Sequence, residues 1–167
     1  MHMSNRPFAI SLSGPDITSR ECALVEQVLS TPILSLGPML ERFEAAVAAF
    51  VGRRFAVGVW SGTAGLHLAV LEAGLGPGDE VITSSFSFVS SANCLLYVGA
   101  RPVFVDIQPD TLNLDPALIE RAITPRTKAI LPVHIFGQPC GMKAIMNIAS
   151  RHGLIVIEDA CEALGAQ

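Results

Sequence analysis

The chain has 167 residues, of which 50% are hydrophobic and 16% are charged, and its formal net charge is −4. This composition argues against a disordered chain, and the absence of about 18 uninterrupted apolar residues argues against a membrane-spanning helix. The mild negative charge, without a stripe of Lys or Arg residues, argues against a nucleic-acid-binding protein, and the length favours one ordinary domain.

The N-terminal third of the chain predicts two helices followed by a strand. An amphipathic stretch at 22–29 follows Asp16 and Thr18, either of which is suited to cap the helix. The second predicted helix, at 39–51, has apolar residues at helical spacing. The short apolar run at 55–60 then predicts a buried strand.

From residue 61 onward, predicted helices and strands alternate. Asp115 and Pro116 have the N-cap and N1 residue types of a helix start, and that helix runs to Ile123. The other predicted helices are 64–73, 88–98 and 141–152, and the further strands are 80–83, 102–106, 128–133 and 154–157. Apolar strands about 25 residues apart, with helices between them, predict a parallel sheet covered by helices on both faces.

In such a sheet, ligands bind beyond the carboxyl ends of the strands. After the first predicted strand, Ser61, Gly62 and Thr63 form a small-residue turn at the start of a helix. Backbone N–H groups and a hydroxyl in that position suit a phosphate, although a plain helix N-cap remains the alternative interpretation. Neither a P-loop nor a G-x-G-x-x-G fingerprint is present.

Two other strand ends carry candidate ligand-binding side chains. Phe86 and Phe88 lie in a serine-rich loop after the second strand, where they would either stack on a ring or anchor the next helix in the core. Glu158 and Asp159 follow the last strand. An acid there would pair with a protonated ring nitrogen, cap a helix or bind a metal, and the pair alone does not decide between these roles.

The histidines and cysteines give weaker signals. His134 follows the fourth predicted strand, where a general base, a group contacting a ring and a structural histidine all fit the pattern. His67 lies within an apolar helix and is interpreted as structural. The chain has four widely spaced cysteines, at Cys22, Cys94, Cys140 and Cys161. They form no C-x-x-C pair, so no zinc or redox motif is predicted. With no signal-peptide pattern at residues 1–6, they favour a reducing cytoplasm.

Six segments, taken in order, resemble a single family. They are SGTAGLHL (61–68), GPGDEVIT (76–83), FSFVSSAN (86–93), GARPVFVD (99–106), ITPRTKAI (123–130) and VIEDA (156–160). Together they resemble the DegT/DnrJ/StrS sugar aminotransferases, fold-type-I enzymes that use pyridoxal 5′-phosphate (PLP). The resemblance runs from about residue 33 to residue 167.

The resemblance implies an α/β fold, namely the three-layer αβα large domain of aspartate aminotransferase-like PLP-dependent transferases, with a mostly parallel sheet. Residues 1–32 would form an N-terminal helical segment and residues 33–167 the N-terminal part of that domain. The chain would then be truncated, without the rest of the large domain or the C-terminal small domain. The strand predicted at 55–60 would lack its neighbours and expose apolar surface.

The resemblance also implies roles for individual residues. Gly62 and Thr63 would hold the PLP phosphate, and Phe88 would stack on the pyridine ring. Asp159 would pair with the pyridinium nitrogen and keep the ring an electron sink. Glu162 would also border the cofactor, at a position where family members often have Gln or His.

The activity implied is the transfer of an amino group, typically from glutamate, to a keto group of a nucleotide-linked sugar, by a cytoplasmic homodimer. The lysine that forms a Schiff base with PLP is expected beyond Gln167. Lys128 and Lys143 match no family position, so no catalytic residue is assigned and the chain alone is expected to be inactive. Two alternatives remain: a sugar dehydratase of the same family, with His in place of the lysine, and a non-catalytic fragment that binds a small molecule.

Overall fold

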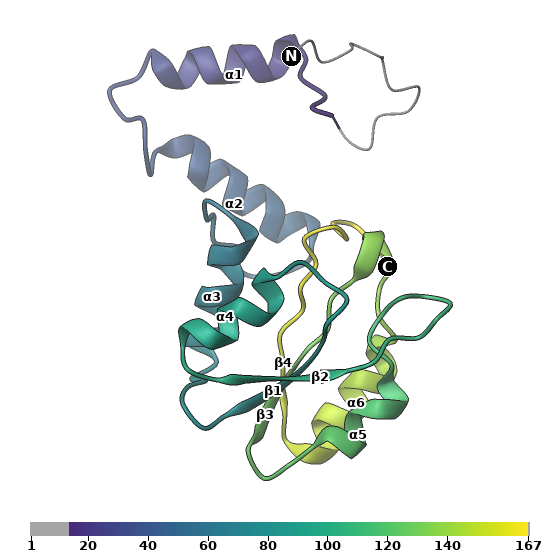
Figure 1. The fold of residues 1–167 in the computed structure, drawn as a ribbon. Coiled ribbons are helices and arrows are strands. Elements are labelled where there is room, and N and C mark those ends of the chain that lie inside the picture. Colours follow the sequence, from purple (N-terminus) through teal and green to yellow (C-terminus); the bar gives the residue numbers. More distant parts are fainter. Residues whose placement is uncertain (1–13, 167) are drawn as a thin grey trace, which may run out of the picture. The chain divides into compact units, whose positions relative to one another are not determined.

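A computed structural model of the chain describes residues 14–166 (Figure 1). By its internal contacts, the chain divides into two compact units, Met1–Gly58 and Val59–Gln167. The described part of the first unit contains two helices, α1 (Ser19–Leu29) and α2 (Pro38–Phe50). Both helices were predicted from the sequence, with boundaries that differ by at most three residues.

Helix caps settle one alternative and confirm one prediction. Thr18, not Asp16, caps α1, because its hydroxyl accepts a hydrogen bond from the helix and its N–H donates to the Glu21 carboxylate at 2.7 Å. In the second unit, Asp115 caps a helix that has Pro116 in its first turn, as predicted.

The second unit contains a four-stranded parallel sheet with the order β2-β1-β3-β4. The strands are β1 (Glu80–Ser84), β2 (Arg101–Val105), β3 (Thr127–Leu131) and β4 (Ile155–Val156). The helices are α3 (Gly62–Glu72), α4 (Ser90–Tyr97), α5 (Pro116–Ala122) and α6 (Met142–His152), with a short 3₁₀ turn, η1 (Ile135–Gly137). The predicted parallel α/β fold is therefore confirmed.

The two faces of the sheet carry separate cores. Val81 of β1 packs with Leu95 of α4 in one cluster. The next residue, Ile82, packs with Ile119 of α5 and Ile145 of α6 in the other. Figure 1 shows α3 and α4 on one side of the sheet and α5 and α6 on the other. Because successive side chains of a strand point to opposite faces, this alternation builds the three αβα layers.

The strand predicted at 55–60 is wrong. These residues have no strand assignment, and Phe55 and Trp60 are 71% and 89% exposed. An apolar run forms a strand only where a neighbour satisfies its N–H and C=O groups, and none of the four described strands pairs with this segment. The described sheet therefore has four strands rather than five. Among residues 14–166, no helix has both the length and the hydrophobicity needed to span a membrane.

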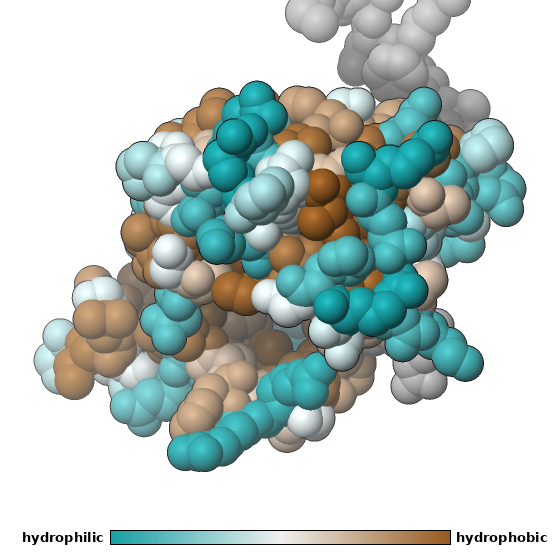
Figure 2. All heavy atoms as spheres, turned by 90° about the horizontal axis from the view of Figure 1, so that it is seen from below, coloured by the Kyte–Doolittle hydropathy of each residue, from teal (hydrophilic) through white to brown (hydrophobic). Residues whose placement is uncertain are grey.

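A buried carboxylate joins the beginnings of three strands. Glu80 of β1 is 1% exposed. Its carboxylate accepts hydrogen bonds from Arg101 at 2.9 Å, from two nitrogens of Arg126 at 2.7 and 2.9 Å, and from the Thr124 hydroxyl at 2.6 Å. These hydrogen bonds offset the cost of burying the Glu80 charge. The molecule seen from below, toward the ends where the strands begin, shows hydrophilic residues around a hydrophobic area (Figure 2).

The Glu80 network predicts an acid-sensitive part of the folding stability. The Thr124 hydroxyl, followed by Arg126, lowers the pKa of the Glu80 carboxyl below 4.5. A lowered pKa contributes stability above the unfolded value of 4.5, and this contribution is lost as the pH falls through the folded value. In urea unfolding series at decreasing pH below 4.5, the free energy of unfolding should fall more steeply for the wild type than for the Glu80→Gln variant. Equal pH dependence in the two proteins would contradict the assignment.

Candidate functional site

A pocket of about 670 Å³ lies beyond the carboxyl ends of the strands in the second unit. It is lined by the start of α3, the loop after β1, the loop after β3 and the segment after β4. The lining residues are Ser61, Gly62, Thr63, Ser85, Phe86, Ser87, Phe88, Ser90, Val133, His134, Ile135, Phe136, Asp159, Cys161 and Glu162. All five residues that the sequence assigns to a cofactor site thus line one pocket.

The N-terminus of α3 forms one wall of the pocket. The Ser61 hydroxyl accepts a hydrogen bond from the N–H of Ala64 at 3.2 Å, so Ser61 is the N-cap. Helical geometry leaves the N–H groups of Gly62 and Thr63 without an acceptor inside the helix. A Cβ atom on Gly62 would lie 2.7 Å from the Cys161 Sγ, so a side chain there would displace Cys161. A helix N-terminus with unpaired N–H groups and no side chain on its first residue suits an anion.

The two phenylalanines after β1 have different environments. Phe86 packs edge-on against Phe136, with ring centroids 6.3 Å apart and an interplanar angle of 88°. Phe88 lies in the loop immediately before α4 and is 75% exposed at the pocket. The helix predicted at 88–98 begins only at Ser90, and this later start leaves the Phe88 ring free to contact a ligand.

Asp159 is the buried acid of the site. It is 5% exposed and lies in an extended segment bridged to Val133, which prolongs the pairing of β3 and β4. Its carboxylate accepts hydrogen bonds from the Ser91 hydroxyl at 2.7 Å and from the N–H of Cys161 at 3.3 Å. Within residues 14–166 this carboxylate makes no ion pair. A buried carboxylate without a protein cation suits a cationic ligand group.

Glu162 is tied to the loop after β3. Its carboxylate accepts a hydrogen bond from the N–H of Phe136 at 2.8 Å. Phe136 has a φ of 53°, in the left-handed region that bulky residues rarely adopt. The carboxylate therefore holds a strained loop residue at the edge of the pocket.

His134 and His67 take structural positions. His134 is 5% exposed, and its Nδ1 accepts a hydrogen bond from the N–H of Cys140 at 3.1 Å. The proton of the neutral ring therefore lies on Nε2, which is 3.1 Å from the Glu158 carboxylate. With both nitrogens engaged, His134 lines the pocket as a structural group rather than as a free base. His67 packs edge-on against Tyr97, which fits its structural interpretation.

Comparison with known proteins identifies the family. The model of the DegT/DnrJ/EryC1/StrS aminotransferase family matches residues 15–167. The chain belongs to this family.

Three relatives illustrate the similarity. The chain is 49% identical to the spore coat polysaccharide biosynthesis protein SpsC of Bacillus subtilis, over 95% of this chain and 40% of that protein. It is 48% identical to the GDP-perosamine synthase of Caulobacter vibrioides, over 98% of this chain and 44% of that protein. The structure of NtdA from Bacillus subtilis with bound cofactor PMP superposes with a TM-score of 0.83 at 41% identity, over 89% of this chain and 35% of that one. The chain thus spans less than half the length of these relatives.

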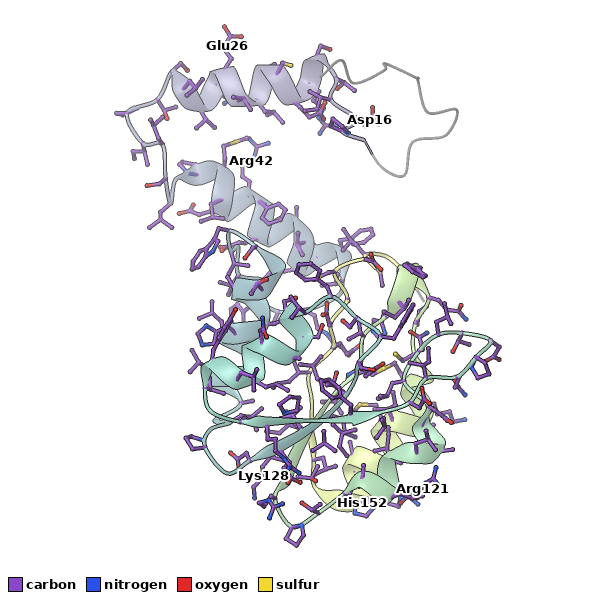
Figure 3. All side chains as sticks on the ribbon, viewed as in Figure 1. Asp16, Glu26, Arg42, Arg121, Lys128 and His152 are labelled. Atoms are coloured by element: carbon purple, nitrogen blue, oxygen red, sulfur yellow. The ribbon has the colours of Figure 1, made fainter. Side chains whose placement is uncertain are left out.

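Aminotransferases of the DegT/DnrJ/EryC1/StrS family depend on PLP, and solved relatives contain PLP or its amino form, pyridoxamine phosphate (PMP). The chain has two lysines, Lys128 and Lys143. Lys128 lies on β3 near the end where the strands begin (Figure 3), and Lys143 lies on α6. Both are exposed and neither lines the pocket.

Sequence reasoning missed Asn113, which holds the loop after β3. Asn113 is 1% exposed; its amide oxygen accepts a hydrogen bond from the N–H of Ile135, and its amide nitrogen donates to the carbonyl of Gln138, both at 3.0 Å. These partners lie 22 and 25 residues away along the chain. No local sequence pattern around Asn113 predicts that role.

Three of the four cysteines do not support nucleophilic chemistry. Burial raises the pKa values of the Cys94 and Cys140 thiols to about 11, and partial desolvation together with the Asp159 carboxylate raises that of the exposed Cys161 to about 11, so each is protonated at neutral pH. Because the thiolate is the nucleophilic form, these thiols are weak nucleophiles. Cys161 lines the pocket of this DegT-family chain as a packing group against Gly62.

Proposed function

We propose that the pocket binds PLP and PMP, and that the chain is part of a PLP-dependent aminotransferase acting on a nucleotide-linked sugar. Gly62 and Thr63 bind the phosphate through the helix start, Phe88 stacks on the ring, and Asp159 pairs with the ring nitrogen. The observation that carries this proposal is the buried Asp159 carboxylate, which has no cationic partner in the described chain.

The residues present fit the cofactor. The pocket volume lies within the range of roughly 300–1,000 Å³ typical of small-molecule sites. The absence of a side chain at Gly62 exposes N–H donors to a phosphate, and the acceptor-only carboxylate of Asp159 matches a protonated nitrogen. When bound, the cofactor withdraws electrons from the carbon that carries the amino group. Asp159 strengthens that effect by holding the ring nitrogen protonated, and Glu162 borders the site by holding Phe136 in place.

The remaining assignments extend this proposal. The name GDP-perosamine synthase denotes a nucleotide-linked amino sugar, which supports that substrate class for the present chain. We place the lysine that holds the cofactor covalently outside these residues, because Lys128 and Lys143 lie away from the pocket. Residues 33–167 then belong to the PLP-binding domain and residues 1–32 precede it. Glutamate as amino donor, a homodimer and the cytoplasm complete the proposal.

Titration with PMP tests the proposal, because PMP needs no covalent bond to the protein. Cofactor fluorescence should saturate at one PMP per chain. Pyridoxamine, which lacks the phosphate, should bind roughly tenfold more weakly or worse, since it forgoes the helix N-terminus. Equal affinity for the two compounds, or no saturable binding of PMP, would contradict the proposed site.

A further inference from the structure

Three side chains form a continuous hydrogen-bonded chain beside the pocket. The Ser87 and Ser91 hydroxyl oxygens are 2.7 Å apart, and Ser91 Oγ lies 2.7 Å from Asp159 Oδ2. Ser91 is 1% exposed, whereas Ser87 is half-buried and lines the pocket. An ionised carboxylate only accepts hydrogen bonds, so Ser91 donates to Asp159 and accepts from Ser87, whose hydroxyl also lies 3.2 Å from the carbonyl oxygen of Phe88.

These hydrogen bonds link two parts of the site that are distant in sequence. Ser91 lies in the first turn of α4 and Asp159 follows β4, 68 residues later. Phe88 lies between the two serines in sequence, at the end of the loop that Ser87 ties to Ser91. The hydrogen bonds therefore couple the position of Phe88, the stacking residue, to that of Asp159. Successive hydrogen bonds also polarise one another.

The chemistry of a hydroxyl suits this position. A donor is needed because Asp159 is buried and makes no ion pair within the described residues. A lysine or arginine in place of Ser91 would neutralise the carboxylate and remove its attraction for a cationic ligand. The neutral Ser91 hydroxyl stabilises the charge and leaves it available to the ligand.

We propose that Ser91 is a positioning residue for the cofactor: it orients the Asp159 carboxylate toward the pocket and, through Ser87, fixes the loop that carries Phe88. This inference rests on the proposed function of the pocket. It concerns the side chains of Ser87, Ser91 and Asp159 and requires no covalent step.

The test measures PMP affinity at neutral pH for the wild type, Ser91→Ala, Ser91→Thr and the control Ser150→Ala, which alters an exposed residue of α6. Ser91→Ala should weaken PMP binding roughly tenfold at neutral pH, as expected for a hydrogen bond to a charged group. Ser91→Thr retains the hydroxyl and should restore the affinity, and Ser150→Ala should match the wild type.

The outcomes separate this inference from the proposed function. Failure of the wild type to bind PMP would overturn both, whereas wild-type binding with unchanged affinity in Ser91→Ala would overturn only this one. In an Asp159→Asn background, Ser91→Ala should no longer weaken PMP binding; a further loss of the same size would also refute it. If circular dichroism shows that Ser91→Ala does not fold, Ser87→Ala decides. That variant should weaken PMP binding roughly threefold, and an unchanged affinity would overturn the inference.

Discussion

Replacing Asp159 with asparagine should weaken PMP binding by roughly 10- to 150-fold, the range for a hydrogen bond to a charged group. The substitution keeps the size and one acceptor oxygen of the side chain but removes its charge. It also introduces an amide donor beside the Ser91 hydroxyl, which would have to reverse its hydrogen bonds in order to accept from it. The measurement is a fluorescence titration with PMP at neutral pH.

The matched control for this prediction is Asp110→Asn, which makes the same change in an exposed turn. Asp110 bonds only to the N–H of the next residue, so this variant should bind PMP like the wild type. If Asp159→Asn and Asp110→Asn bound PMP equally well, Asp159 would not be the partner of the ring nitrogen.

Gly62→Ala should weaken PMP binding roughly tenfold by distorting the start of α3. The added Cβ would lie 2.7 Å from the Cys161 Sγ, so the Cys161 side chain, the first helical turn or the segment after Asp159 must shift. Overpacking of this kind costs about 1–3 kcal/mol. The loss should be smaller for pyridoxamine than for PMP, because the displaced N–H groups face the phosphate.

Removing the clashing sulfur provides the rescue. Cys161→Ala alone should bind PMP nearly as the wild type does, and the double variant Gly62→Ala with Cys161→Ala should regain most of the lost affinity. A double variant as weak as Gly62→Ala would show that contact with Cys161 is not the cause. Full affinity in Gly62→Ala itself would show that the phosphate does not approach this helix start.

Elements with local signals could be predicted from the sequence. Asp115 followed by Pro116 marked the start of α5 because an N-cap acceptor and a proline in the first turn suit only that position. The four apolar strands of the parallel sheet were predicted for the same kind of reason, since strands covered on both faces are apolar throughout. The segment 55–60 has the same composition but no strand beside it, and pairing is not a local property.

The candidate site also combines residues that the sequence predicts with residues that depend on distant partners. Ordered motifs placed Gly62, Phe88 and Asp159 at chain positions that converge, because parallel strands end at one edge of the sheet. The support around them could not be predicted. Ser91 and Asn113 meet their partners across 68 and 22 residues, and a lone serine or asparagine carries no signal of such a contact. The role of Glu162 in holding Phe136 likewise depends on a strained loop conformation.

A crystal structure of the chain with PMP tests the central claim most directly. The phosphate should lie at the N–H groups of Gly62 and Thr63, the ring against Phe88, and the ring nitrogen within hydrogen-bond distance of the Asp159 carboxylate. PMP bound elsewhere, or bound in this pocket with its phosphate away from α3 and its nitrogen away from Asp159, would contradict the account.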